Sequence, residues 1–419
     1  MSPDSSSGRD SADAAERRLR PRGSNHAGMR QFNERVVLQA IRFHGSLPKA
    51  EIARLTHLTA QTVQIIIARL EADGLVRKLA PVRGKVGQPS VPMALNPDGA
   101  FSIGIHIGRR RMEMLLVDFA GQVRARTTLG YASPDPDTLF DEIESRMQGF
   151  ADALAPTQRT RLHGVGVAAP FSLGGWQPLL GTPPAQAARW AETDIAARIA
   201  ERTTLPVEFV KDTAAACVAE LVAGRGREIR SFLYFFVDTF IGGGLVLDSH
   251  LRAGVHGNAG AVGSLALGLP GASGAPAQLL SVASLFKLEA ALAAQGLAPE
   301  AIADGRALEL PYRSHTRAWL SEAAQAVAMA INGASCLLDF EGVIIDGAFG
   351  RELLAAMLAE TGAAMDRFSW EGVTRPALLA GTIGADARAI GGALLPLYAN
   401  FAPDRDLFLK LDAAVPTAR

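Results

Sequence analysis

Two glutamines have the chemistry to read the edges of DNA bases. Gln61 and Gln64 lie near the start of an expected helix and off its apolar stripe. A glutamine amide donates and accepts at once, which matches N6 and N7 of adenine in the major groove. Two solvated surface glutamines are the alternative interpretation. If this helix enters the groove, the first-turn residues that contact DNA are Thr59, Ala60, Gln61, Thr62 and Gln64.

A second candidate contact is the glycine-containing segment PVRGKVGQP at residues 81–89. It carries Arg83, Lys85 and Gln88 between two short apolar runs, so we expect a hairpin with cations at its tip. Such a loop brings charge and backbone N–H groups to phosphates or into the minor groove. An ordinary solvated hairpin is the alternative, but the position directly after two helices favours a DNA contact.

Three short helices must position these residues. Apolar residues recur at helical spacing over 33–43, and Gly45 should end that helix. A second helix is expected to start near Pro48, and Thr59 is a suitable N-cap for a third. One apolar stripe of the third helix should be buried, and it comprises Val63, Ile66, Ile67 and Leu70.

Two strands, residues 75–79 and 90–95, flank the basic loop. Helices followed by a strand pair predict a winged helix-turn-helix. We therefore expect a DNA-binding domain over residues 31–98, preceded by a disordered basic tail over residues 1–30.

Beyond Gly99 the pattern changes to a hairpin followed by alternating helices and strands, and this plan occurs twice. The first unit should contain strands at 101–107, 112–118, 163–169 and 207–210, with helices at 138–154, 185–202 and 212–224. The second should contain strands in 231–254 and at 342–345, with helices at 279–294, 316–338 and 387–399. This order predicts a duplicated α/β body over residues 99–419, with a cleft between two lobes that meet near residue 225.

Charge and composition limit the classes of function. Residues 1–100 carry 15 lysines and arginines against 9 acidic residues, whereas the remainder carries 27 against 33. A basic N-terminal part and an acidic remainder are expected if only the N-terminal part binds a polyanion. No run approaches the roughly 18 apolar residues of a membrane span, and the first 25 residues have no apolar core. With only Cys217 and Cys336, a disulfide framework is excluded, so we expect a cytoplasmic protein without membrane contact.

Residues 33–402 resemble the ROK family, which groups repressors, open reading frames and sugar kinases. Within it, the chain resembles the transcriptional regulators that carry an N-terminal winged helix. The matching segments, in chain order, are GKVGQPSVPMALNP, VKDTAAACVAE, DTFIGGGLVLDSHLRAG, HGNAGAVGSL and GADARAIGGALL. The resemblance implies a two-lobe body of the RNase H-like, actin-like fold that sugar kinases share.

The departures from the family pattern bear on activity. Kinases of the family open with an Asp-x-Gly-Gly-Thr loop that approaches the ATP phosphates and helps to hold Mg²⁺. Here the loop reads His106-Ile107-Gly108-Arg109-Arg110, so the carboxylate is replaced and bulky side chains follow. The family's zinc cluster reads Ser264 and LPGASGAPAQ, without cysteine. The resemblance therefore implies a catalytically inactive body that holds no metal and uses no cofactor.

Asp212 matches the family's catalytic base, which takes the proton from a sugar hydroxyl. Without ATP it transfers nothing, although a carboxylate still accepts hydrogen bonds from hydroxyls. Capping of the following helix explains Asp212 equally well. Lys211 and Ser264 stand where the family has a sugar-contacting Asn and a His. We expect Lys211, Asp212 and Ser264 to form an effector site, with the cation suited to a sugar phosphate or sugar acid.

We expect the protein to be a DNA-binding transcriptional regulator of carbohydrate-related genes. The resemblance favours repression, because repression is the more common mode of regulation in the family. Its expected partners are double-stranded operator DNA, a small-molecule effector and further copies of the chain in a homodimer or homotetramer. Two alternatives remain open at this point. One is an active hexose kinase with a DNA-binding appendage, and the other is a body that binds no ligand and serves only as an oligomerisation scaffold.

Overall fold

The computed structural model describes residues 26–81, 90–171, 173–175, 181, 183–270 and 274–403. The described residues form two compact units. The first contains residues 26–95 together with Phe401–Pro403, and the second is Asn96–Asn400. Each unit is described by itself below.

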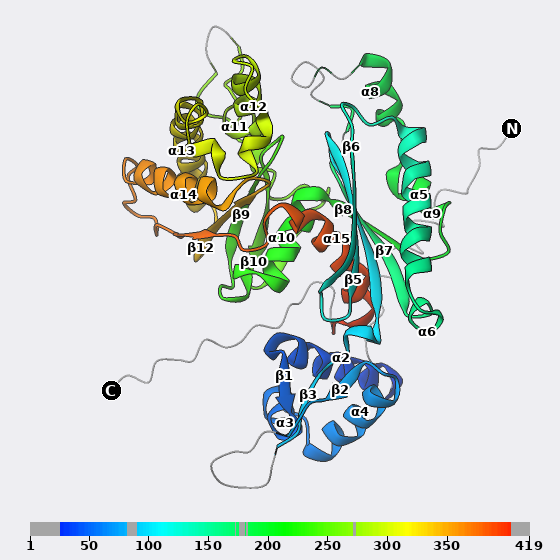
Figure 1. Ribbon diagram of the computed structural model, residues 1–419. Coiled ribbons are helices and arrows are strands. Elements are labelled where there is room, and N and C mark those ends of the chain that lie inside the picture. Colours follow the sequence, from blue (N-terminus) through cyan, green and yellow to red (C-terminus); the bar gives the residue numbers. More distant parts are fainter. Residues whose placement is uncertain are drawn as a thin grey trace, which may run out of the picture. The chain divides into compact units, whose positions relative to one another are not determined.

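The first unit is a winged helix-turn-helix (Figure 1). Its elements, in chain order, are α2 (His26–His44), β1 (Ser46–Pro48), α3 (Lys49–Thr56), α4 (Ala60–Ala72), β2 (Val76–Lys78) and β3 (Pro92–Leu95). The three strands form an antiparallel sheet in the order β1-β3-β2. The expected strand pair is confirmed, whereas β1 was not expected from its three residues.

Local signals set the helix ends of this unit. Gly45 has a φ of 77°, which a residue with a side chain rarely adopts, and it ends α2. The side chain of Thr59 accepts from the backbone N–H of Thr62, so the predicted N-cap of α4 is confirmed. α2 begins at His26 and not near residue 33, inside the segment assigned to the tail. The reason is that a helix can extend beyond the apolar residues that reveal it.

The second unit has two lobes, each built on a five-stranded sheet (Figure 1). The first sheet has the order β6-β5-β4-β7-β8, and the second has the order β11-β10-β9-β12-β13. In both, three consecutive strands pair antiparallel and two further strands add in parallel. The matching order confirms the predicted duplication.

The first lobe contains β4 (Phe101–Ile107), β5 (Arg111–Asp118), β6 (Val123–Gly130), β7 (Leu162–Ala169) and β8 (Val207–Lys211). Its helices are α5 (Pro136–Ala153), α6 (Pro156–Arg159), α8 (Pro184–Ala191), α9 (Ile195–Ala200) and α10 (Asp212–Ala223). The single helix expected over 185–202 is wrong, because Asp194 caps a new helix by accepting from Ala197 N. β6 was also not expected.

The second lobe contains β9 (Phe232–Val237), β10 (Gly242–Leu247), β11 (His250–Arg252), β12 (Gly342–Gly347) and β13 (Ala377–Ala380). Its helices are α11 (Leu279–Ala283), α12 (Leu285–Ala293), α13 (Arg313–Ser335), α14 (Arg351–Met365) and α15 (Ala387–Phe401). The expected helix over 279–294 is wrong as one element. Ser284 has extended backbone angles and divides it into α11 and α12.

The two sheets are held apart by α10 and α15, which lie between them (Figure 1). Glycines allow this packing at backbone distance. A Cβ on Gly166 of β7 would lie 1.8 Å from Gly392 O, and one on Gly391 would lie 1.8 Å from Ala215 O. The helices therefore sit closer to each other and to the first sheet than any side chain permits.

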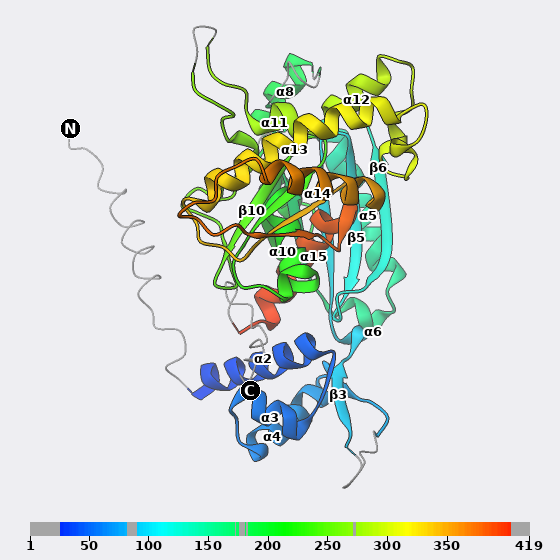
Figure 2. The ribbon, with the colours of Figure 1, turned by 90° about the vertical axis from the view of Figure 1, so that its left-hand side faces the viewer.

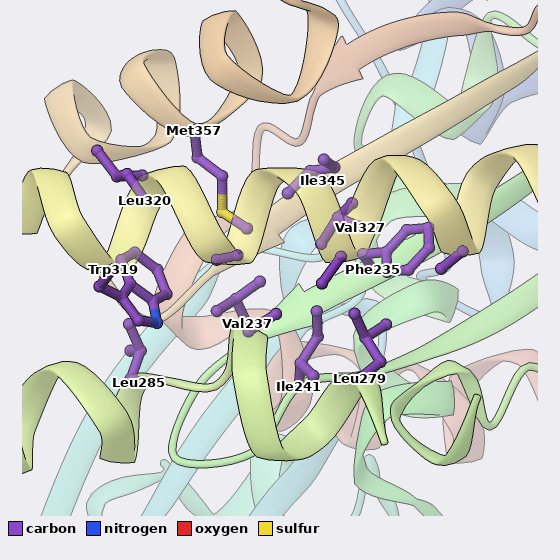
Figure 3. Close-up of a cluster of buried hydrophobic side chains, with 14 of the residues drawn as sticks. Phe235, Val237, Ile241, Leu279, Leu285, Trp319, Leu320, Val327, Ile345 and Met357 are labelled. Atoms are coloured by element: carbon purple, nitrogen blue, oxygen red, sulfur yellow. The ribbon is translucent and has the colours of Figure 1, made fainter. Parts of the chain in front are cut away.

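The outer faces of the sheets carry the main cores. α5 and α9 cover the first sheet, and α11 to α14 cover the second; Figure 2 shows α13 and α14 crossing in front of β10. In the second lobe Trp319 and Val327 of α13 face Phe235 and Val237 of β9 (Figure 3). Ile241 belongs to the same buried cluster and follows β9 in the chain. The core of this lobe therefore includes a residue of the loop between β9 and β10, which faces the first lobe.

Candidate functional site

The exposed face of α4 is the candidate DNA-reading surface. Gln61 and Gln64 are both exposed, whereas the predicted stripe on the opposite face is buried. Ile65 shares the exposed face with 56% of its surface accessible, and Ala68 extends it by one turn. Spacings of three, four and seven residues from Gln61 align these four side chains.

Sequence reasoning missed Ile65 as a site candidate. Its signal was an isoleucine off the buried stripe, and an apolar side chain there suits contact with a thymine methyl group. Thr59 and Thr62 are engaged with each other, since their hydroxyl oxygens lie 2.8 Å apart. Ala60 is exposed. The predicted contacts Arg83, Lys85 and Gln88 lie outside the described residues.

In the second unit, the turn between β4 and β5 occupies the place of the predicted first loop. Gly108 N–H donates to Arg111 O at 2.9 Å, and Tyr131 OH donates to Gly108 O at 2.7 Å. The guanidinium carbon of Arg109 lies 4.5 Å from the centre of the Phe240 ring. Phe240 follows β9, so Arg109 extends from the first lobe to the second.

A charged network lies beside this turn. His106 Nδ1 is 3.3 Å from Glu113 Oε2, and Arg111 Nε is 3.2 Å from Glu113 Oε1. Burial, assisted by the charge of Arg388, lowers the pKa of His106, so the imidazole is neutral at neutral pH. Burial works against ionisation of Glu113, but the hydrogen bond from His106 and the nearby arginines outweigh it and lower the pKa of this carboxyl.

The network continues into α15 and the second lobe. Arg388 of α15 pairs with Asp238 at 2.5 Å, with side chains that are 4% and 20% exposed. The Arg388 guanidinium also lies 4.9 Å from the centre of the Phe236 ring. Burial opposes ionisation of Asp238, yet the charges of Arg388 and Arg111 lower its pKa. Sequence patterns gave no signal for this pair, because its members are far apart in the chain.

A pocket of about 180 Å³ lies between the two lobes, with polar and apolar side chains in its lining. Its lining includes Lys211, Asp212 and Ser264, the three residues for which the family resemblance implied an effector site. Asp212 is 7% exposed, and its Oδ1 accepts from Thr213 N at 2.8 Å. Asp212 is the first residue of α10 and Lys211 is the N-cap, so the alternative that Asp212 caps this helix is wrong.

Further lining residues were not singled out from the sequence. Asn258 Oδ1 accepts from Lys211 Nζ at 2.6 Å. Thr213 is 6% exposed, and its Oγ1 makes no hydrogen bond within the described part of the chain. Arg109 and Phe171 also line the pocket. A carboxylate, an amide, hydroxyls and cations beside aromatic rings form an arrangement that suits a small polyol.

A second pocket of about 260 Å³ lies on the other side of the turn. Its lining includes Arg109, Arg110, Asp238 and Glu289. Burial, with the charge of Asp238, raises the pKa of Glu289. Arg109 contributes to the lining of both pockets.

No three His, Cys, Asp or Glu side chains in the described ranges gather closely enough to hold a metal ion. None of the helices in the part of the chain that the structure covers has the length and hydropathy that a membrane crossing requires.

Comparisons with known proteins divide the chain in the same way. Residues 31–85 match the MarR family, and residues 102–397 match the ROK family. A crystal structure of a ROK family transcriptional regulator, a homologue of the Escherichia coli MLC protein, has a TM-score of 0.65 at 20% identity over 89% of this chain and 98% of that one. A ROK glucokinase from Streptomyces griseus, solved with glucose and AMPPNP, has a TM-score of 0.58 at 19% identity over 71% of this chain and 99% of that one. These similarities show the fold.

Curated relatives share similar levels of identity. The xylose repressor of Bacillus subtilis is 23% identical over 58% of this chain and 62% of its own length, so the match spans less than two thirds of that relative. An uncharacterized protein of Sinorhizobium fredii is 24% identical over 88% of this chain and 92% of its own length. A transcriptional regulator of Mycobacterium tuberculosis is 29% identical over 53% and 50%. Because the family match spans residues 102–397, most of the chain, this protein belongs to the ROK family.

Proposed function

We propose that this protein is a DNA-binding transcriptional repressor whose kinase-like body senses a small molecule in the cytoplasm. The observation that carries the proposal is the exposed Gln61–Gln64 face of an N-capped helix in a MarR-type winged helix. Relatives described as a xylose repressor and as a transcriptional regulator support it. Control of carbohydrate-related genes is part of the proposal.

The body, in this proposal, transfers no phosphoryl group. Arg109 and Arg110 fill the turn in which the family's kinases place a glycine and a threonine. His106 stands in place of the Mg²⁺-holding carboxylate, is fully buried and pairs with Glu113. A phosphate approaching the turn would meet side chains and not backbone N–H groups. Incubation with ATP, Mg²⁺ and a panel of hexoses tests this, and turnover at an ordinary enzymatic rate would overturn it.

Effector binding in the 180 Å³ pocket is proposed to change the angle between the lobes, because both lobes line it. A coupling of about 1–3 kcal/mol between effector and operator is enough for regulation. We further propose that chains pair through the body to serve an inverted-repeat operator. An apolar groove on the second lobe, with Leu337 of its lining 85% exposed, is the surface proposed for a second copy.

The decisive experiment is selection of genomic DNA fragments by the full-length protein, followed by affinity measurements on the selected fragments. Protein lacking residues 1–97 is the comparison. The proposal requires sequence-specific binding by the full chain and its loss in the truncated protein. Equal binding by both proteins would show that the winged helix is not the reader.

A further inference from the structure

In the described chain, the second unit passes between its two lobes twice. The first passage is α10 with the short 3-10 helix Arg225–Arg227, which together lead from β8 to β9. The second passage is the segment 381–386, which leads from β13 to α15. α10 packs against β10 of the second sheet, whereas α15 packs against the first sheet, where a Cβ on Gly104 of β4 would lie 2.1 Å from Ala389 O. A change of the angle between the lobes must therefore be absorbed in or beside these passages.

One buried carboxylate holds both passages. Glu220 of α10 is fully buried, and its Oε1 accepts from Arg225 N at 2.6 Å, in the first passage. From the second passage, Thr382 N at 3.1 Å and Ile383 N at 3.3 Å donate to its Oε2. Thr382 Oγ1 also donates to its Oε1, at 3.1 Å. These four donors converge on a single side chain, and hydrogen bonds to a carboxylate are stronger than those between neutral groups.

A second buried carboxylate completes the hold on the second passage. Asp346 of β12 is 1% exposed, and its Oδ2 accepts from Gly384 N at 2.7 Å. Three successive N–H groups, those of Thr382, Ile383 and Gly384, therefore point at two buried carboxylates, as in the backbone nests that bind anions. Burial raises the pKa of both carboxyls, and the backbone hydrogen bonds oppose this rise. The contacts thus stabilise the carboxylates only while the second passage keeps this backbone conformation.

The far end of the second passage is tied to the first sheet instead. Arg126 of β6 donates from Nη1 to Asp386 Oδ1 at 2.6 Å, and these side chains are 50% and 25% exposed. Gly384 lies between the two anchors and has a φ of 78°, which glycine adopts without steric cost. A hinge consists of a few residues at the end of an element that absorb changes of backbone angle. The second passage has this form, with each end fixed to a different lobe.

We propose that the second passage is the hinge of the body, and that Glu220 and Asp346 form a latch that sets the angle between the lobes. While both carboxylates hold the N–H groups of residues 382–384, the segment keeps the described conformation. Release of the latch frees the turn at Gly384, so that α15 and the first sheet move against the second lobe. The inference rests on the proposed function only in regarding this movement as regulatory. It deepens that function by naming the residues on which a change of lobe angle must act.

The test measures the lobe angle in the full-length protein. Cys336→Ser removes the exposed native thiol, and Cys217 is buried. Ser145→Cys in α5 and Glu360→Cys in α14, both at exposed positions, then place one spin label on each lobe. Pulsed electron paramagnetic resonance gives the distance distribution between the two labels. Dilution with unlabelled protein removes distances between different chains.

The main variant is Glu220→Gln, which keeps the size of the side chain but replaces one acceptor oxygen by a donor that cannot face backbone N–H groups. We expect a broader or shifted distance distribution, with hydrogen exchange at residues 382–384 faster by about ten-fold or more, as for the loss of a hydrogen bond to a charged group. Asp118→Asn is the matched control. Asp118 is 2% exposed and accepts from Ala120 N and Gln122 N, so the same chemistry holds a turn within one lobe. This control should leave the distance distribution unchanged.

A wild-type distance distribution in Glu220→Gln would overturn the proposal, and so would an equal broadening in Asp118→Asn. If circular dichroism shows that Glu220→Gln does not fold, Arg126→Met takes its place, because it releases the other end of the hinge at an exposed pair. An unchanged distribution in that variant would be equally decisive. None of these measurements uses DNA, whereas the DNA selection tests the winged helix alone. Failure of the latch and failure of the proposed function are therefore distinguishable.

Discussion

Breaking the Arg388–Asp238 pair should destabilise the body more than loss of any surface ion pair. The substitution Arg388→Met keeps the apolar stem and removes the charge. It leaves the Asp238 carboxyl without its nearest cation, in a side chain only 20% exposed. Removing one partner of a buried pair costs about 3–5 kcal/mol, and the partial exposure of Asp238 places the expected loss near the lower value, about 3 kcal/mol.

The assay is urea unfolding followed by tryptophan fluorescence and circular dichroism. With a slope of about 3 kcal/mol per molar, a loss of about 3 kcal/mol lowers the midpoint by about 1 M. The double variant Asp238→Asn with Arg388→Met should recover much of the loss, because no uncompensated charge remains.

The matched control is Arg375→Met. Arg375 pairs with Asp366 at 2.5 Å, but those side chains are 41% and 65% exposed. Solvent screens such a pair, so the expected loss is about 0–1 kcal/mol. If Arg388→Met destabilises the protein no more than this control does, the reasoning about the buried network is refuted.

Three further predictions follow from the described residues. Gln61→Ala and Gln64→Ala should each weaken specific DNA binding by about 1–3 kcal/mol in fluorescence anisotropy, whereas Gln325→Ala in α13 leaves it unchanged; equal effects at all three would remove α4 as the reader. Burial lowers the pKa of His106, so the stability this residue gains as a neutral group is complete above about pH 6.5 and is lost as pH falls through the folded-state pKa. Relative to His106→Gln, the wild type should lose up to about 1.4 kcal/mol per pH unit more in that range by urea unfolding, and parallel curves would contradict this. Leu337→Glu should shift the protein towards monomer in sedimentation velocity, and an unchanged distribution would place the pairing surface elsewhere.

Elements with strong local signals could be predicted from the sequence. The third helix of the winged domain was expected with its cap and its buried stripe, because both depend on residues within a few positions of each other. β6 could not be predicted because its exposed residues, such as Arg124 and Thr128, are mostly polar, and Leu129 is the one large apolar residue among its half-buried ones. β13 could not be predicted from the sequence, because a run of four small or apolar residues does not distinguish a strand from a loop.

The pocket could be predicted only in part. Lys211, Asp212 and Ser264 were expected together because the family resemblance relates their positions, and the structure places them in one lining. Arg388 and Asp238 could not be found in this way. Their contact depends on the packing of α15 between two sheets, and no periodicity or spacing in the sequence reports that distance.

The glycine contacts between the layers set which parts of the body tolerate change. At Gly166 even a single methyl group would overlap the backbone of α15, so the spacing of the layers admits no substitution without displacement of a helix. At residue 109, by contrast, the side chain extends towards two cavities, and a large arginine is accommodated there. The turn between β4 and β5 can therefore change its side-chain chemistry at residue 109, while the glycine contacts keep the separation of the helices and the sheet fixed.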